Sequence, residues 1–298
     1  KKKVHIFQIR PITIDHSFFE KFAENKLTKK LNQSVKNFRK LQVKRNKIIG
    51  NKAIFGNMPD WNPAEIIGVK PNPLSMDLYK FLITNSVWST QRKQYGYRHI
   101  KQTPLMVDFC NQPYIDVRAS LNSFIPKKLP EKLSQKLCNS YLDILEKNPN
   151  LHDKIEFNIA FTAWTPNFIF VAKERLKKYQ FSISELKQIE DALKEITKKS
   201  FLRIDDDTKD IKKMHLKRER LMSSKKSDLN KFIILIGDCK KYGTLSFAHS
   251  ARAGFVAMTL LKSFVKENIF STKRYNQLMS GVYSVSKQFD NELNLLKN

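Results

Sequence analysis

The chain has 298 residues, 41% of them hydrophobic and 11% aromatic, which excludes disorder over most of its length. No apolar run reaches the roughly 18 residues that a membrane span requires. The formal net charge of +27 permits nucleic-acid binding, but the lysines are spread over predicted helix faces, so a solvated basic surface is the favoured interpretation. Cys110, Cys138 and Cys239 lack metal-ligand spacing, so no metal site is predicted and we expect reduced thiols of a cytoplasmic protein.

Residues 4–9 alternate as a short strand that ends in Gln8-Ile9-Arg10-Pro11. They lack the apolar core and cleavage site of a signal peptide, so secretion is not expected. Because this strand has no nearby partner, we expect residues 1–14 to be the tail of a domain that begins before this sequence. Residues 15–47 then predict a long polar helix with one apolar face.

Residues 56–68 combine an acid, amides and an indole around a predicted helix start. Asn62 can cap the helix, Pro63 suits its first position, and Glu65 stands where a capping-box carboxylate belongs. Free amides at a helix N-terminus bind anions, and an adjacent indole offers a flat wall for a ligand. We therefore predict Asp60, Trp61 and Asn62 as substrate-binding residues. The alternative is a capped surface helix with Trp61 in the core.

A second Asn-Pro pair predicts a helix over residues 72–88, and the polar aromatic segment 91–99 that follows supplies Arg98 as a candidate binding residue. Residues 104–110 and 113–117 predict two strands. If the second strand stays extended, its polar residues share one face and form a binding surface, although an acid two residues from an arginine can equally be a local ion pair. These candidates are Asp116, Arg118, Ser120 and Asn122.

Residues 130–146 predict an amphipathic helix and residues 155–164 a third strand. The rest is expected to be almost all helix, over 168–179, 184–200, 207–240, 245–267 and 271–296. His249 and Arg252, three apart on one helix, could bind a phosphate or carboxylate, or His249 could be a core residue. We expect an α+β, mainly helical fold: a mixed α/β region over 15–166, with a small mixed sheet and flanking helices, and a C-terminal helical bundle over 167–298.

Four segments carry a resemblance to a known family: Gln8-Ile9-Arg10-Pro11, residues 60–63, residues 114–123 and residues 247–255. Together they resemble the central region of the phosphoenolpyruvate synthase and pyruvate phosphate dikinase family, and within it the bacterial glutamine kinases of capsule phosphoramidate synthesis. The resemblance implies an ATP-dependent phosphotransferase that acts through a phosphohistidine. It also implies ATP and Mg²⁺ as cofactors, Gln8 and Arg10 as nucleotide-binding residues, and a small-molecule acceptor such as L-glutamine.

The chain departs from that family because it lacks a glycine-rich phosphate loop, with eight glycines in all, and the segment that carries the phosphorylated histidine. The ATP-binding and phosphohistidine domains are therefore expected as partners, and the isolated chain is predicted to be inactive. Acceptor binding is predicted for arginines 98, 118 and 252 as anion donors, for Asp60 or Asp116 at an ammonium, and for Asn62 or Asn122 as amide readers. The alternatives are a non-catalytic docking module for a swinging phosphohistidine domain and a basic nucleic-acid-binding protein.

Overall fold

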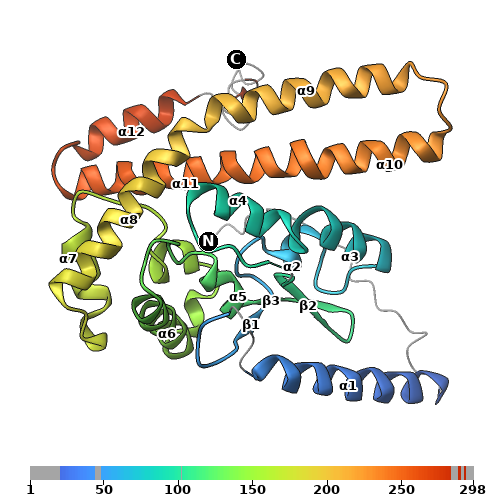
Figure 1. Cartoon of the computed structure of the whole chain (residues 1–298), viewed down its shortest axis with the longest axis horizontal. Coiled ribbons are helices and arrows are strands. Elements are labelled where there is room, and N and C mark those ends of the chain that lie inside the picture. Colours follow the sequence, from blue (N-terminus) through green and yellow to red (C-terminus); the bar gives the residue numbers. More distant parts are fainter. Residues whose placement is uncertain (1–20, 44–47, 102, 283–287, 290–291, 293–298) are drawn as a thin grey trace, which may run out of the picture.

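The computed structural model of the chain describes residues 21–43, 48–101, 103–282, 288–289 and 292. The expected α+β, mainly helical class is confirmed, because helices surround one small three-stranded sheet (Figure 1). Gln8 and Arg10, and the strand predicted around them, lie outside the described residues. Within the described ranges, no helix is both long and apolar enough to cross a membrane.

The first half of the chain builds the sheet and the helices around it (Figure 1). Asn62 and Asn72 both cap as predicted, accepting hydrogen bonds from the amides of Glu65 and Ser75. In chain order the elements are α1 (Lys21–Gln42), β1 (Phe55–Gly56), α2 (Pro63–Ile66), α3 (Pro73–Tyr79), a π-helix (Lys80–Thr84), α4 (Val87–Tyr95), β2 (Met106–Phe109), β3 (Gln112–Asp116), α5 (Val117–Asn122) and α6 (Glu131–Lys147).

The described residues of the second half form only helices and their connections. They are a 3₁₀-helix (Pro149–Leu151), a π-helix (Ile155–Ile159), α7 (Phe168–Arg175), a 3₁₀-helix (Lys177–Tyr179), α8 (Ile183–Leu202), α9 (Ile204–Met222), α10 (Asp228–Asp238), a π-helix (Cys239–Thr244), α11 (Leu245–Lys266) and α12 (Thr272–Gly281). The first turn of α9 contains the three consecutive acids 205–207, which the sequence predicts as a helix start.

The sheet is antiparallel throughout, in the order β1-β3-β2, and not mixed as predicted. Strands β2 and β3 form a hairpin whose two turn residues, Cys110 and Asn111, both have positive φ angles of 55° and 64°. Positive φ at both positions is typical of a type I′ turn, which matches the twist of the strands. Helix α1 lies along one side of the sheet, where Phe38 packs against Phe55 and Phe109 (Figure 1).

The predicted third strand over residues 155–164 is wrong. Ile155 and Ile159 are both buried, four residues apart, whereas Phe157 is 44% exposed. That spacing belongs to a helical turn, and the structure forms a π-helix there. The third strand of the sheet is instead the two-residue β1, which pairs with β3 at Asp116 and Ile115.

The alternating binding surface predicted from Asp116 to Asn122 is also wrong. The strand ends at Asp116, whose carboxylate accepts a hydrogen bond from the Ala119 amide at 3.1 Å and caps α5. On a helix, residues two apart point in different directions, so these side chains separate. A buried cluster that includes Val117, Leu121 and Phe124 then anchors α5 against α6.

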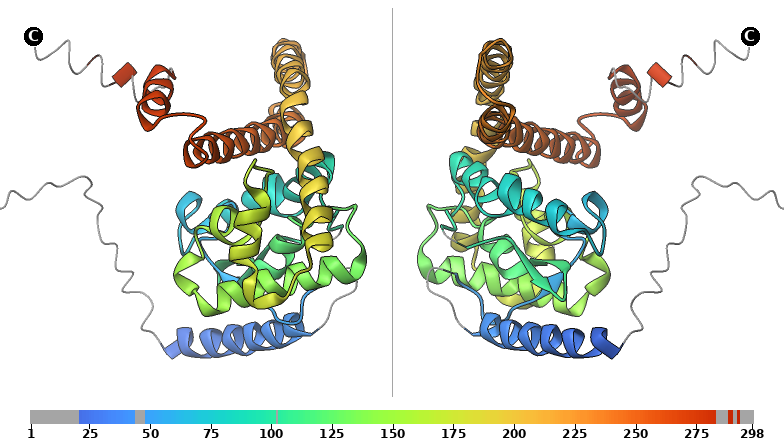
Figure 2. Two further views of the ribbon diagram at one scale, coloured as in Figure 1. Left: turned by 90° about the vertical axis from the view of Figure 1, so that its left-hand side faces the viewer. Right: turned by 90° about the vertical axis from the view of Figure 1, so that its right-hand side faces the viewer.

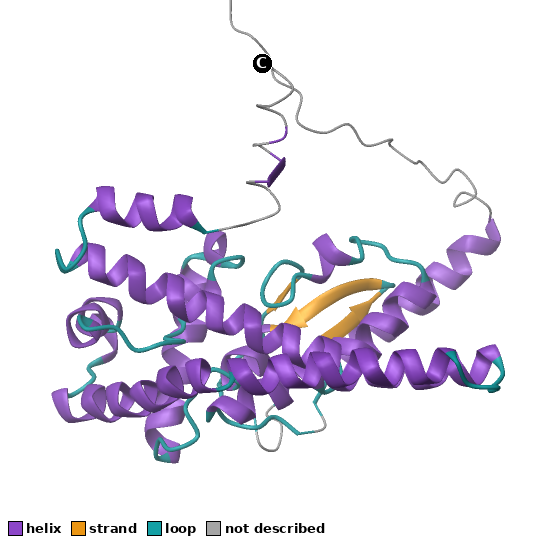
Figure 3. Ribbon diagram, turned by 90° about the horizontal axis from the view of Figure 1, so that it is seen from above, coloured by secondary structure: helices purple, strands orange, loops and turns teal. Residues whose placement is uncertain are grey.

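The C-terminal helices differ from prediction in where the chain breaks. The predicted helix 207–240 ends at Met222, and Ser227 caps a new helix at Asp228. From there α10, the π-helix Cys239–Thr244 and α11 run on without interruption to Lys266. Figures 1 and 3 show α9 lying antiparallel beside this long helix, and Figure 2 shows the pair standing over the sheet region.

Two glycines with positive φ angles allow a matched test of backbone packing. A Cβ atom at Gly50 (φ 114°) would lie 2.8 Å from Leu142 and 3.2 Å from Arg118, whereas at Gly68 (φ 90°) it would meet nothing within 4 Å. Gly68→Ala is expected to cost about 1–2 kcal/mol of unfolding free energy from backbone strain alone. Gly50→Ala should cost about 1–3 kcal/mol more because it also overpacks the core. Urea unfolding measures both, and equal losses would contradict the close approach at Gly50.

Candidate functional site

Three consecutive residues, Asp60, Trp61 and Asn62, adopt left-handed backbone conformations with φ angles of 44°, 59° and 35°. For residues other than glycine this conformation costs roughly 1–2 kcal/mol each, and such strain concentrates at functional sites. Contacts on both sides hold the loop: the Tyr79 hydroxyl donates to the Trp61 carbonyl, and the Asn62 side chain caps α2. In this backbone conformation the Asp60 carboxylate points into the protein interior, where the side chain is 2% exposed.

A buried ion pair receives that carboxylate. Arg92 Nη2, on α4, donates to Asp60 Oδ1 at 2.6 Å, and the Ser120 hydroxyl, on α5, donates to Asp60 Oδ2 at 2.6 Å. Arg92 Nη1 also donates to the Ser123 hydroxyl. The guanidinium lies 4.0 Å from the centroid of the Phe124 ring, and the Arg92 and Asp60 side chains are each 2% exposed. The pair therefore joins the strained loop to α4 and α5.

A second pair, less well satisfied, lies beside the first. Arg252 Nη1, on α11, is 2.7 Å from Glu156 Oε2, but the two atoms are not aligned as a hydrogen bond. Glu156 Oε1 is 3.7 Å from Arg92 Nη2. Burial acts to lower the pKa of Arg252, but the Glu156 carboxylate, with smaller contributions from Tyr97 and Asp60, raises it above its ordinary value. Arg252 is therefore a permanent cation.

These charges surround a cavity of about 200 Å³, here called the Asp60 cavity. Helix α4 contributes Gln91 and Arg92, and α11 contributes Arg252. The π-helix contributes Glu156, and the strained loop contributes Asp60. The remaining wall is apolar: Trp61 and Phe247 pack with ring centroids 6.2 Å apart, beside Ala248, Ala251 and Phe255.

Several polar atoms of the Asp60 cavity have no hydrogen-bond partner among the described residues. They are the donors Gln91 Nε2, Arg92 Nε and Arg252 Nε. Arg252 Nη1 and Glu156 Oε2 also lack an aligned hydrogen bond, but each has the other as its ion-pair partner at 2.7 Å. Burial raises the pKa of the neighbouring Tyr95 hydroxyl and Gln91 acts to lower it, but the Gln91 amide nitrogen does not form a hydrogen bond of normal geometry with that hydroxyl. Buried polar atoms without partners cost free energy, so a cluster of them in a cavity indicates a missing ligand or water.

His249 belongs to a separate buried cluster with α9. Its Nδ1 atom lies 3.0 Å from Arg203 Nε and 2.8 Å from Asp207 Oδ1. Because an arginine can only donate, Nδ1 accepts, and Asp207 then contacts it best as a protonated acid. Burial, with smaller effects of Asp210 and Asp206, raises the pKa of Asp207 to about 6 against the opposing charge of Arg203. Burial and Arg203 lower the pKa of His249 to about 3.

The structure brings Asp60, Trp61 and Arg252 of the predicted site residues into one cavity, with Ser120 behind Asp60. The others lie elsewhere. Asn62 and Asp116 cap helices, Arg118 donates to the carbonyls of Leu41 and Val43, Asn122 bonds the backbone of Ile49, Arg98 pairs with Glu131, and His249 contacts Asp207.

Gln91 and Arg92 lie in segment 91–99, from which the sequence predicted only Arg98 as a binding residue, and Glu156 and Phe247 were not predicted as site residues at all. A signal existed for Arg92, a charged residue between the apolar Trp88 and Tyr95 on one helix. Nothing in the sequence around Glu156 predicts a site residue, because Glu156 joins the site only through its ion pair with Arg252 of α11. Comparison of the chain with protein-family models, curated proteins and solved structures finds no match.

The buried Arg92–Asp60 pair is expected to carry a large structural cost when one partner is removed. Arg92→Met leaves the Asp60 carboxylate without its buried partner, and should lower the free energy of unfolding by about 3–5 kcal/mol. Arg98→Met removes a partly exposed pair with Glu131 and should cost at most about 1 kcal/mol. Urea unfolding of both variants makes the comparison, and similar losses would contradict the structural role of the pair.

The Asp207–His249 contact predicts a pH-dependent difference between wild type and Asp207→Asn. With a folded pKa of about 6 against an ordinary 3.8, protonated Asp207 favours the folded state below about pH 4, and this contribution is lost as pH rises through 6. Asparagine keeps a donor at every pH. The stability of the variant relative to wild type should therefore rise, on the order of 1–3 kcal/mol, between pH 4 and about 6.5.

Thermal and urea unfolding across this range measure that difference. Asp205→Asn, which alters another exposed carboxylate in the same helical turn, is the control. A difference between Asp207→Asn and wild type that stays constant with pH would contradict the protonation of Asp207.

Proposed function

We propose that the chain binds a small zwitterion, of the size and charge of an amino acid, in the Asp60 cavity. The observation that supports this most directly is that two buried donors without hydrogen-bond partners among the described residues, Gln91 Nε2 and Arg252 Nε, line the same cavity as the Glu156 carboxylate, which Arg252 contacts only as an unaligned ion pair. A ligand with an ammonium and a carboxylate satisfies both kinds of atom. A cavity of about 200 Å³ has the volume of roughly seven water molecules, at about 30 Å³ each, which is enough for a ligand of this size.

Each end of the ligand has a partner in this arrangement. The ammonium binds the Glu156 carboxylate, and the ligand carboxylate binds the guanidinium edge of Arg252 and the Gln91 amide. Trp61 and Phe247 offer apolar surface to the ligand side chain. Asp60 and Arg92 stay paired and fix the walls. This keeps a zwitterion as the ligand but changes all three predicted contacts. Glu156 replaces Asp60 or Asp116 at the ammonium, and Gln91 replaces Asn62 or Asn122 as the amide. Arg252 replaces Arg118, whose guanidinium donates to the carbonyls of Leu41 and Val43.

In the context of the family resemblance, we propose that the zwitterion is the acceptor of an ATP-dependent phosphoryl transfer through a phosphohistidine, with L-glutamine as the candidate. Fixed positive charge near the acceptor helps such a transfer, because negative charge spreads over the phosphoryl oxygens. Within the described ranges no group of three His, Cys, Asp or Glu side chains could hold a metal. We assign the ATP and Mg²⁺ that the resemblance implies to a separate ATP-binding domain.

A docking module is the second candidate function, and α10 supports it. None of its residues is buried, and its apolar residues Leu229, Phe232 and Ile233 are 69%, 57% and 55% exposed. Exposed apolar surface of this kind is typical of protein contacts. A docking module does not need the Asp60 cavity to bind a small molecule, so ligand binding separates the two functions.

Calorimetric titration with L-glutamine tests the proposed function. Two analogues separate the ends of the ligand: 5-amino-5-oxopentanoate lacks the ammonium, and 4-aminobutanamide lacks the carboxylate. Both should bind more weakly than L-glutamine. Gln91→Leu should weaken L-glutamine binding about tenfold or more, because a charge-assisted hydrogen bond contributes about 1.5–3 kcal/mol.

Gln94→Leu is the matched control, since Gln94 lies on the same helix but is exposed and does not line the cavity. It should bind L-glutamine as wild type does. If no amino acid of a broader panel binds the wild-type chain, or if the two leucine variants bind equally, the zwitterion site is wrong and the docking function is favoured.

A further inference from the structure

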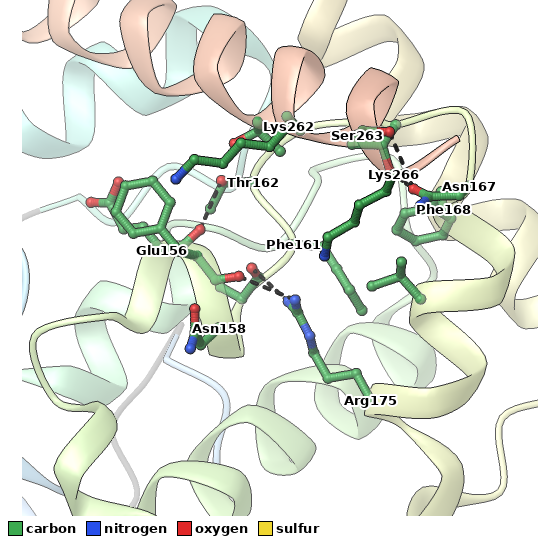
Figure 4. A pocket seen from close by; sticks show the side chains of 16 residues that line it. Glu156, Asn158, Phe161, Thr162, Asn167, Phe168, Arg175, Lys262, Ser263 and Lys266 are labelled. Atoms are coloured by element: carbon green, nitrogen blue, oxygen red, sulfur yellow. Dashed lines mark hydrogen bonds between the residues drawn. The ribbon is translucent and has the colours of Figure 1, made fainter. Parts of the chain in front are cut away.

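A second cavity, of about 240 Å³, lies against the first and is not needed for zwitterion binding (Figure 4). It is bounded by the π-helix Ile155–Ile159 and the loop after it, by α7 and by α11. We call it the Lys262 cavity. Glu156 lines both cavities, and Phe157 of the second packs edge to face on Phe255 of the first, with centroids 5.3 Å apart. The two cavities therefore share a wall.

Positive charge dominates the Lys262 cavity. Lys262 and Lys266, one turn apart on α11, extend their amines over it, and Arg175 of α7 lies across from them (Figure 4). Neither lysine forms an ion pair with a described residue within 4 Å. The lining carboxylate, Glu156, is engaged by Arg252 in the neighbouring cavity. Three cations thus face a space in which they meet little compensating charge.

Arg175 is a fixed cation in this wall. Its Nη2 donates to the Phe157 carbonyl at 3.1 Å, and Nη1 lies 3.3 Å from the carbonyls of Ile159 and Ala160. Its guanidinium also stacks 4.5 Å from the Phe161 ring centroid. These bonds use its outer nitrogens to hold the end of the π-helix. Arg175 therefore supplies positive charge to the cavity, while the lysines have free hydrogen-bond donors.

Neutral polar groups complete the lining. The buried hydroxyls of Thr162 and Ser263 face the cavity, the first bonded to the Glu156 carbonyl at 3.1 Å and the second to Asn167 at 3.3 Å (Figure 4). Asn158 adds an exposed amide at the rim. Because those two hydroxyl protons are already used, the donors that remain for an anion with several acceptor oxygens are the two lysine amines and the Asn158 amide.

We propose that the Lys262 cavity binds the phosphate group of a small molecule, either free phosphate or a phosphate monoester. A phosphate carries between one and two negative charges near neutral pH and presents oxygens in several directions, which matches two lysines and a fixed guanidinium around one space. This proposal stands on the charges of the Lys262 cavity and does not depend on zwitterion binding.

The test is calorimetric titration with inorganic phosphate at constant ionic strength, on wild type and on two double variants of equal charge. Lys262→Gln/Lys266→Gln should weaken phosphate binding about tenfold, since each lysine contributes a charge-assisted contact. Lys225→Gln/Lys226→Gln changes two exposed lysines in the turn between α9 and α10, at the far end of that hairpin from α7 (Figure 1), and should change binding less than twofold.

Equal weakening in both double variants would show general attraction to a basic chain and would overturn the proposal, as would absence of phosphate binding by wild type. Titration with glycerol 3-phosphate distinguishes the two sources of phosphate: tighter binding than inorganic phosphate identifies a monoester, and weaker binding identifies the free ion. Gln91→Leu should leave phosphate binding unchanged. If wild type binds L-glutamine but not phosphate, this inference alone is rejected and the zwitterion site stands.

Discussion

The ion pair between Arg92 and Asp60 is the interaction on which the centre of the molecule depends. It joins a strained loop to α4, and through the hydroxyls of Ser120 and Ser123 it fixes α5 in the same network. Both charges are almost fully buried. Removing such charges from water is costly, and the attraction between them rarely returns more than that cost. Well-packed apolar residues often serve stability as well as a buried ion pair does, so the contribution of this pair is to position the loop, α4 and α5 relative to one another.

The two cavities extend this reasoning across the π-helix. Ile155 and Ile159 anchor the turn in the core, and Arg175 donates to the carbonyls of Phe157, Ile159 and Ala160, so the backbone that carries Glu156 is fixed on both sides. π-Helices are rare and frequently occur at functional sites. Here one places a single carboxylate in the wall between two cavities whose other charged groups differ. A zwitterion on one side and a phosphate on the other would then lie close to the same residue, as an acceptor and a phosphoryl group must in a transfer reaction.

Much of the local structure could be predicted from the sequence because its causes are local. The caps at Asn62 and Asn72 need only a side chain and the amide three residues on, and the β2–β3 hairpin needs only two short alternating runs. The strand predicted over 155–164 failed because alternation in so short a segment cannot separate a strand from a helical turn. β1 could not be predicted either, because two residues show no period.

The site was predicted only in part, for a different reason. Asp60 and Trp61 stand out because they adjoin a helix start, and Arg252 because it lies among small residues. Gln91 and Glu156 become important only when α4, the π-helix and α11 meet, and those contacts join residues about 60 to 160 positions apart in the chain. Arg118 was misassigned because the chain forms helix α5 after Asp116 and does not stay extended to Asn122, and in the helix its guanidinium donates to the carbonyls of Leu41 and Val43.

The uninterrupted helix from Asp228 to Lys266 has a mechanical consequence. At 1.5 Å per residue, Arg252 lies about 36 Å from the exposed start of α10. A displacement at that start is therefore carried along a single lever to the wall of the Asp60 cavity, with the π-helix Cys239–Thr244 as the one change of helical pitch along its length. Helix α9 is attached to this long helix close to Arg252. Asp207 of α9 and Arg203, the residue before it, both contact His249, which is three residues before Arg252. Motion of the hairpin and the position of a cavity arginine are thus geometrically linked.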